Sequence, residues 1–158
     1  GIDISDKMVE LTQQLVAKQA LADRVQLSRG DAEHLDFADG SFDCAVIGFG
    51  LRNFTDKELA LRELHRVLPP EGVLLILEFS KPGNPLLESA YGAFQALWPG
   101  MGKLVAGESG SYQYLVESIR VHPNQRALKL MMEDAGFGAV EYHDLVGGIA
   151  AIHRGVRA

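Results

Sequence analysis

Two short apolar runs, separated by a helical pattern, constrain the fold of this 158-residue chain more than any other feature. The first run covers residues 42–47, and the second covers residues 72–79. Apolar runs of this length without alternation are typical of strands that are buried on both faces of a parallel sheet. Between the runs, leucine and valine recur at helical spacing until Pro69 and Pro70. The pattern therefore predicts a strand, a helix and a second strand of an α/β sheet.

The end of the first run, within residues 41–53, carries the residue types of a ligand site. Gly48 and Gly50 allow a close approach of the backbone, and Arg52 and Asn53 bring guanidinium donors and an amide to the same place. Open α/β sheets bind their ligands at the carboxyl ends of the strands. A buried strand followed by a glycine-containing turn explains the same residues, so both interpretations stay open.

Two acidic side chains stand at the ends of shorter strand candidates. Asp3 lies in the opening GIDIS segment, and Asp31 follows a strand candidate at residues 25–27. A carboxylate at a strand end can accept hydrogen bonds from ribose hydroxyls, as we consider for Asp3, or from the amino group of adenine, as we consider for Asp31. Solvated turn carboxylates would give the same pattern, and the residues alone do not decide.

The rest of the chain completes one α/β domain over residues 1–158. Residues 139–145 and 148–153, with Gly147 near the turn, predict an antiparallel hairpin. A mostly parallel sheet that ends in such a hairpin is the Rossmann-like arrangement of class I methyltransferases. Residues 82–120 interrupt the alternation of strands and helices and predict a helical insertion that covers a sheet edge, a partner subunit or an apolar substrate.

Composition excludes several classes of function. The net charge of −6 and the isoelectric point near 5.3 disfavour nucleic acid as a partner and favour a small-molecule substrate. The single cysteine, Cys44, excludes an internal disulfide and a cysteine-based zinc site, and its place in an apolar run predicts a small buried hydrophobe. No apolar run reaches the ~18 residues of a membrane-spanning helix. We expect a cytoplasmic protein without a metal ion.

Five segments together carry a specific resemblance. They are GDAEHLDF, SFDCAVIGFGLRNFTDKELALRELHRVL, GVLLILEFSKPGNPL, KLVAGESGSYQYLVESI and EYHDLVGGIAAIHRG. This combination closely resembles the UbiE-type family of C-methyltransferases of ubiquinone and menaquinone biosynthesis, over nearly the whole chain. The resemblance implies S-adenosylmethionine as the methyl donor and a polyprenylated benzoquinol or naphthoquinol as the acceptor.

By position, the resemblance also implies roles for single residues at the cofactor. Asp3 would hold the ribose, Asp31 and Ala32 would hold the adenine, and Gly48 would line the cofactor site. Some relatives have serine at the position of Gly48, so a side-chain hydrogen bond is absent here.

Arg52 and Asn53 fall where the family places polar groups on the substrate side, and we expect them to be catalytic. Arg52 would stabilise a developing phenolate, or position a water through which a proton leaves. A guanidinium stays protonated and is a poor general base. Other candidate proton acceptors are His65, His122, His143 and His153.

The family binds the methionine part of the cofactor through a Gly-rich loop after the first strand, and no such loop precedes GIDIS. We therefore expect an N-terminally incomplete sheet and weakened cofactor binding by the chain alone. Two alternatives stay open: a methyltransferase of another small phenol or lipid, and a non-catalytic interaction protein or inactive remnant of the fold. The lipid-like acceptor is compatible with a peripheral contact with the inner membrane, and a homodimer is a further expectation.

Overall fold

The computed structural model describes residues 1–106 and 110–158, with side chains described up to Trp98 and from Gly110 onward. In chain order the elements are β1 (Ile2–Asp3), α1 (Asp6–Lys18), β2 (Ser28–Arg29), β3 (Cys44–Gly48), η1 (Leu51–Asn53), α2 (Lys57–Val67), β4 (Val73–Phe79), α3 (Pro85–Ala106), α4 (Gly110–Val121), α5 (Gln125–Asp134), β5 (Phe137–Leu145), η2 (Val146–Gly148) and β6 (Ala150–Arg157).

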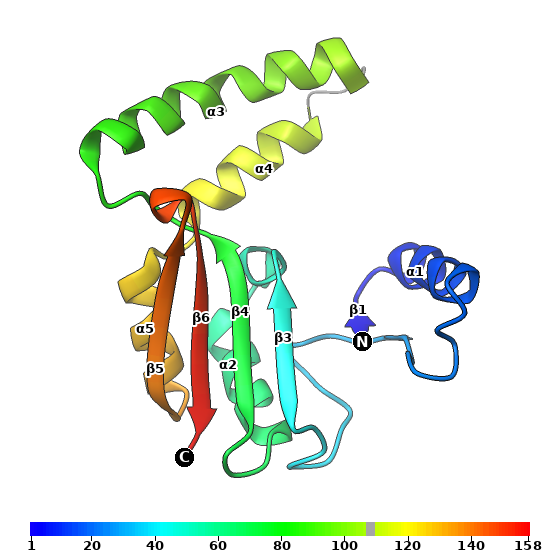
Figure 1. The fold of residues 1–158 in the computed structure, drawn as a ribbon. Coiled ribbons are helices and arrows are strands. Elements are labelled where there is room, and N and C mark those ends of the chain that lie inside the picture. The colour runs from blue at the N-terminus through cyan, green and yellow to red at the C-terminus, as the bar shows by residue number, and fades with distance from the viewer. Residues whose placement is uncertain (107–109) are drawn as a thin grey trace.

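The strands form a four-stranded sheet in the order β3-β4-β6-β5 and a separate pair, β1 and β2 (Figure 1). β3 runs parallel to β4, as the two apolar runs predict, and β1 runs parallel to β2. The predicted terminal hairpin is confirmed, because β5 and β6 pair antiparallel. β6 also pairs antiparallel with β4, where Ile76 faces His153. The fold is therefore the expected α/β arrangement, with parallel and antiparallel pairs.

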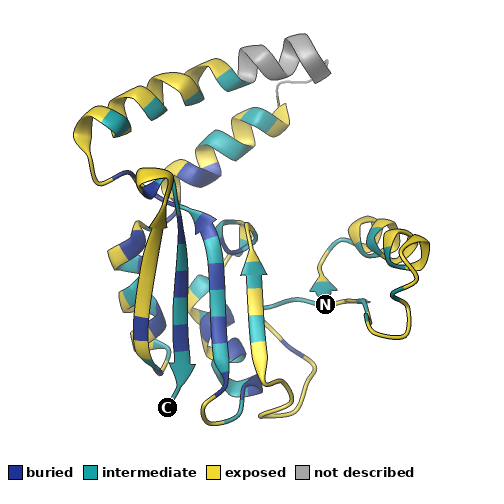
Figure 2. Ribbon diagram, in the orientation of Figure 1, coloured by how far each residue is buried: buried dark blue, intermediate teal, exposed yellow. Residues whose placement is uncertain are grey.

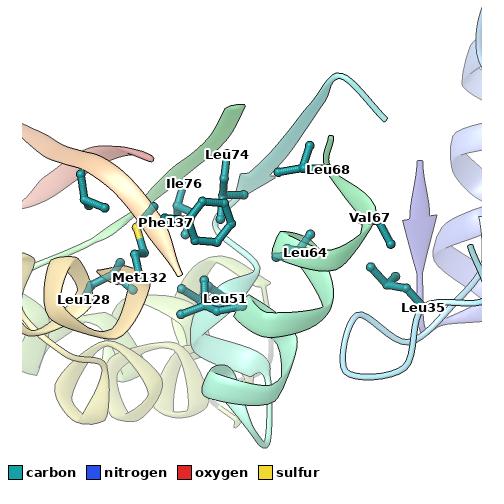
Figure 3. Packing of buried hydrophobic residues seen from close by; sticks show 12 residues of the cluster. Leu35, Leu51, Leu64, Val67, Leu68, Leu74, Ile76, Leu128, Met132 and Phe137 are labelled. Carbon is teal, nitrogen blue, oxygen red and sulfur yellow. The ribbon is translucent and has the colours of Figure 1, made fainter. Parts of the chain in front are cut away.

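One face of the four-stranded sheet is covered by α2 and α5 (Figure 1). α2 begins where the carboxylate of Asp56 accepts a hydrogen bond from the backbone N–H of Leu59 at 2.8 Å. Its buried face packs leucines into the core with side chains of η1, β4, α5 and β5 (Figure 3). Burial of each such leucine stabilises the fold by roughly 2 kcal/mol. The cluster consists of Leu35, Leu51, Leu61, Leu64, Val67, Leu68, Leu74, Ile76, Leu128, Met132, Phe137 and Val140.

β3 differs from its prediction, because it is not buried on both faces. The side chain of Val46 is 70% exposed and Cys44 is exposed, so the expectation of a buried cysteine is wrong. Figure 2 shows exposed segments along β3. The reason is position: among the described residues β3 pairs only with β4 and forms an edge of the sheet. β4 is central as predicted, between β3 and β6, but it is fully buried on one face only: Leu74 and Ile76 are fully buried, whereas Leu75 and Leu77 on the other face are partly buried.

Two helices occupy the predicted insertion at residues 82–120. α3 and α4 pack against each other beyond the carboxyl end of β4 (Figure 1). Within this insertion the sequence predicts a helix at residues 86–97, and α3 extends past it to Ala106. The sequence also predicts an apolar covering segment at residues 91–105, but only the side chains up to Trp98 are among those that the structure describes. Among the described residues, no helix combines the length and the hydropathy needed to cross a membrane.

Candidate functional site

A tight turn after β3 places the candidate catalytic residues. Phe49 has a φ of 54°, in the left-handed region that few non-glycine residues adopt. Its backbone N–H donates to the carbonyl of Leu77 on β4 at 2.8 Å, so the turn stays attached to the sheet. In η1, which follows this turn, the side chain of Leu51 is fully buried in the core, and Arg52 lies at the carboxyl edge of the sheet.

Arg52 is held by Glu78, the penultimate residue of β4. Nη1 of Arg52 lies 3.0 Å from Oε1 of Glu78, and the backbone N–H of Arg52 donates to Oε2 at 3.2 Å. Nη1 also donates to the backbone carbonyl of Phe49. The ion pair is largely desolvated, since the side chain of Arg52 is 12% exposed and that of Glu78 is 1% exposed. Strong electrostatic effects on a bound substrate are expected in such surroundings.

One aromatic ring lies next to the guanidinium. Cζ of Arg52 lies 5.4 Å from the ring centroid of Phe79, within the range of a cation–π contact. The ring of Phe79 in turn lies 4.8 Å from that of Phe49. Nε of Arg52 is buried and has no hydrogen-bond partner among the described residues. Glu78 and the ring of Phe79 thus orient the guanidinium of Arg52, while its Nε–H donates to no described residue.

Asn53 connects the strand edge to the helical insertion. Its Oδ1 accepts a hydrogen bond from the hydroxyl of Tyr114, on α4, at 2.9 Å. Asn53 is exposed, so its amide nitrogen can reach a ligand at this edge. The structure therefore brings Arg52 and Asn53 together, next to the α3 and α4 hairpin.

Asp3 and Asp31 lie at the carboxyl ends of β1 and β2. Asp3 pairs with Arg29 in the parallel register, and Asp31 follows two residues later. Oδ1 of Asp3 accepts from the backbone N–H of Ser5 at 2.8 Å, and Oδ1 of Asp31 accepts from that of Glu33 at 2.9 Å. In each carboxylate the second oxygen has no hydrogen-bond partner among the described residues, so both can accept from a ligand.

A small cavity of about 130 Å³ adjoins Asp31, and Ile2 and Phe37 belong to its lining. Ala32, the next residue along the chain, is partly buried. Gly48 is exposed, and a Cβ added there would meet no atom within 4 Å. Among the described residues, no hydrogen bond or ion pair joins Asp3 or Asp31 to Arg52 or Asn53.

The four candidate histidines lie in different surroundings. His143 is exposed on β5, and the ring of His65 packs edge-on against Phe137 at 5.2 Å. His153 is buried, and its Nε2 lies 2.9 Å from the carbonyl oxygen of Gln125. His122 is 2% exposed and neither ring nitrogen has a partner among the described residues. Burial, followed by the positive charge of Lys57, lowers the pKa of His122 to about 4. None of these histidines hydrogen-bonds to Arg52.

Two residues of this site were not identified from the sequence. Glu78 lies near the end of the second apolar run, and the sequence does not decide between a structural role and a site role for it, although a lone carboxylate inside an apolar strand is itself a signal. Tyr114 carried no signal, because only the packing of α4 brings its hydroxyl to Asn53.

Comparison with known proteins decides the family. The sequence pattern of the ubiE/COQ5 methyltransferase family matches residues 1–157. The chain belongs to this family. A ubiquinone/menaquinone biosynthesis C-methyltransferase UbiE from Ectopseudomonas mendocina is 51% identical over 156 residues, which are 98% of this chain and 61% of that protein. The protein of the same name from Klebsiella pneumoniae is 50% identical, with 98% and 62% covered.

Solved structures agree on the class of fold. An S-adenosylmethionine-dependent methyltransferase from Aquifex aeolicus superposes with a TM-score of 0.65 at 20% identity, over 99% of this chain and 67% of that one. A chain of the complex between the Haloferax volcanii Trm112 methyltransferase activator and a putative methyltransferase superposes with a TM-score of 0.72 at 16% identity. The match covers 99% of this chain and 70% of that one. This member of the ubiE/COQ5 family spans about three fifths of the length of the curated relatives it matches.

Proposed function

We propose that this chain is part of an S-adenosylmethionine-dependent C-methyltransferase that methylates a polyprenylated benzoquinol or naphthoquinol. The observation that carries the proposal is the Arg52 guanidinium, held at the carboxyl edge of the sheet by Glu78. Membership of the ubiE/COQ5 family supports it. Relatives about half identical to this chain are named as C-methyltransferases of ubiquinone and menaquinone biosynthesis.

The chemistry assigns a role to each group at the Arg52 edge. When bound, the cofactor supplies a methyl group, whose bond to sulfur breaks as a bond to the ring carbon forms. Arg52 stabilises the negative charge that develops on the hydroxyl oxygen beside that carbon, an effect of about 3 kcal/mol at a desolvated site. Asn53 orients the same ring through its amide. The ring carbon then loses its hydrogen as a proton, which leaves through a water that Arg52 positions.

Asp3 and Asp31 fit the adenosine part of the cofactor. Asp3 offers an unused carboxylate oxygen to the ribose hydroxyls, and Asp31 offers one to the amino group of adenine beside the cavity. The backbone at Ala32 supplies the donor for a ring nitrogen. Gly48 leaves open space at the end of β3, where the cofactor would approach the backbone.

The α3 and α4 hairpin within residues 82–120 is our candidate for covering the prenyl tail. Leu86, Phe94 and Leu97 of α3 are 80%, 50% and 60% exposed, so an apolar surface is available to a lipid-like chain. The same surface supports a peripheral contact with the cytoplasmic face of the inner membrane. A homodimer stays a prediction.

Calorimetric titration with S-adenosylmethionine tests the proposal first, on this chain and on a form that includes any native sequence upstream of Gly1. We expect tighter binding by the longer form, because the donors for the methionine part are expected in a Gly-rich loop. Turnover assays then compare a demethylated polyprenyl quinol with a small phenol of the same head group. Methylation of the small phenol alone would favour another substrate, and absence of both binding and turnover would favour a non-catalytic protein.

A further inference from the structure

Glu78 is a carboxylate in a place where strands normally carry apolar side chains. It follows Leu74 and Ile76 on the same buried side of β4, and its side chain is 1% exposed. Removal of a charge from water costs several kcal/mol unless good partners compensate, and an apolar residue at such a site is often as stable or more stable. The stability of the fold therefore does not explain this choice of residue.

Two of the three hydrogen bonds that the carboxylate of Glu78 accepts come from Arg52. Oε1 accepts from Nη1 of Arg52 at 3.0 Å and from the backbone N–H of Phe79 at 2.9 Å. Oε2 accepts from the backbone N–H of Arg52 at 3.2 Å. One carboxylate thus holds both the main chain and the side chain of a single residue, which fixes the direction of that side chain as well as its location.

Comparison with a second arginine shows what is unusual about Arg52. Arg66 on α2 uses all three of its guanidinium nitrogens within the protein. Its partners are Glu63, Asp39 and the carbonyls of Phe37 and Leu35. Such saturation is what a structural arginine requires.

Arg52, by contrast, uses one guanidinium nitrogen, Nη1, for Glu78 and for the carbonyl of Phe49. Nε and Nη2 have no hydrogen-bond partner among the residues that the structure describes. Nε is buried, whereas Nη2 is not, so Nη2 can donate to another molecule while Glu78 holds Nη1 and the Phe79 ring lies near the guanidinium carbon.

We propose that Glu78 is a positioning residue, which holds the Arg52 guanidinium so that Nη2 faces the hydroxyl oxygen of the acceptor ring. This inference rests on the proposed function of Arg52. Glu78 does not touch the substrate; it acts by restricting the arginine to one orientation before the substrate binds.

The positioning is measurable without turnover. In protein labelled with ¹⁵N-arginine, the side-chain signals of Arg52 are assigned by their loss in Arg52→Lys. We expect Glu78→Gln to shift the Arg52 Nε signal and to speed rotation and hydrogen exchange of its guanidinium, because the amide carries no charge and opposes one donor with another. Glu63→Gln is the matched control: it removes the same charge from the Arg66 pair and should leave the Arg52 signals unchanged. Arg52 signals that are the same in Glu78→Gln and wild type would overturn the proposal.

Kinetics of the whole protein give the second readout. Glu78→Gln should lower kcat by about tenfold or more with an unchanged KM for the cofactor, as expected when a catalytic group is misoriented. Glu78→Ala should lower kcat further, and Glu63→Gln should leave it unchanged. In the Arg52→Ala background, Glu78→Gln should have no additional effect on kcat. A merely structural Glu78 would instead reduce thermal stability in all variants without this dependence on Arg52.

The two readouts separate the inference from the function on which it rests. If wild type methylates no quinol but the Arg52 signals respond to Glu78→Gln, the proposed function fails and the positioning stands. If wild type is active and Glu78→Gln retains its kcat, the positioning fails and the proposed function stands.

Discussion

The hydroxyl of Tyr114 lies 2.9 Å from Oδ1 of Asn53, so one hydrogen bond joins the α3 and α4 hairpin to the strand edge that carries Arg52. A helix that is far from η1 in the sequence thereby restrains a candidate catalytic residue. Motion of the hairpin and the orientation of the Asn53 amide are coupled through this bond.

Tyr114→Phe should therefore loosen the hairpin without unfolding the domain. The lost hydrogen bond contributes about 1 kcal/mol, so we expect faster amide hydrogen exchange in α4 and a higher KM for the quinol. Tyr112→Phe is the control, because its hydroxyl has no hydrogen bond to the described residues. Equal exchange rates in both variants would show that the bond does not restrain α4.

Arg52→Ala should lower kcat by about a hundredfold at saturating cofactor, the effect expected for loss of one electrostatic group at a desolvated site. The KM for the cofactor should change little, since Asp3 and Asp31 are not in contact with Arg52. Rapid-quench measurement of the first turnover tests this directly. Wild-type turnover in the variant would remove Arg52 from the chemistry.

If Asp3 holds the ribose as proposed, Asp3→Ala should weaken binding of S-adenosylmethionine by roughly tenfold, or about 1.4 kcal/mol. Calorimetry measures the change, with Asp6→Ala as the control. Asp6 is 78% exposed and pairs only loosely with Arg29, at 3.6 Å. If the two variants bind the cofactor alike, Asp3 has no special place at the ribose.

Because of His122, the free energy of unfolding should decrease as the pH is lowered from about 6.5 to about 4. In the unfolded chain it has an ordinary pKa near 6.5, whereas burial lowers the pKa to about 4 in the fold. In that window the unfolded chain binds more protons, so acid favours unfolding, by up to about 3 kcal/mol at the acid end. Burial lowers the pKa of His153 as well, which adds to the effect.

Urea unfolding at pH 7 and pH 5 measures this dependence. His122→Phe should flatten it, because no imidazole remains to take up a proton on unfolding. His143→Phe, at an exposed position, should leave the slope unchanged. Identical slopes in wild type and His122→Phe would assign the acid sensitivity to other groups.

The edge position of β3 gives a prediction on stability. Leu74→Ala should cost about 3 kcal/mol, because Leu74 is fully buried in the core. Val46→Ala should cost less than about 0.5 kcal/mol, since the side chain is 70% exposed. Denaturant melts of both variants check this difference, and a large cost at Val46 would mean that its face is covered in solution.

Local pattern was sufficient for most of the fold. The β3, α2 and β4 unit, the terminal hairpin and the helices at 82–120 follow from apolar runs, helical spacing and turn residues, which act over short distances. The exposure of Val46 and Cys44 could not be predicted in this way, because it depends on what lies beside the strand. An apolar run shows that a strand can be buried. The strands and helices packed beside it determine how far it is buried.

The sequence predicts where the candidate residues lie, but it does not predict their hydrogen-bond partners. Asp3 and Asp31 lie at adjacent strand ends, and Arg52 lies next to Asn53, as expected from the carboxyl ends of parallel strands. The partners of these residues, Glu78 and Tyr114, come from segments that only tertiary packing brings near. Spacing along the chain carries no information about such pairs.

The position of β6 between β4 and β5 has a consequence for synthesis of the protein. β6 follows both of its neighbours in the chain, so β4 and β5 each expose an open edge until β6 has left the ribosome. The hydrogen bonds between β4 and β6 join residues that are far apart in sequence, which slows folding. We therefore expect the nascent chain to be prone to aggregation while β4 and β5 are already outside the ribosome and β6, which pairs with both, is still inside the exit tunnel.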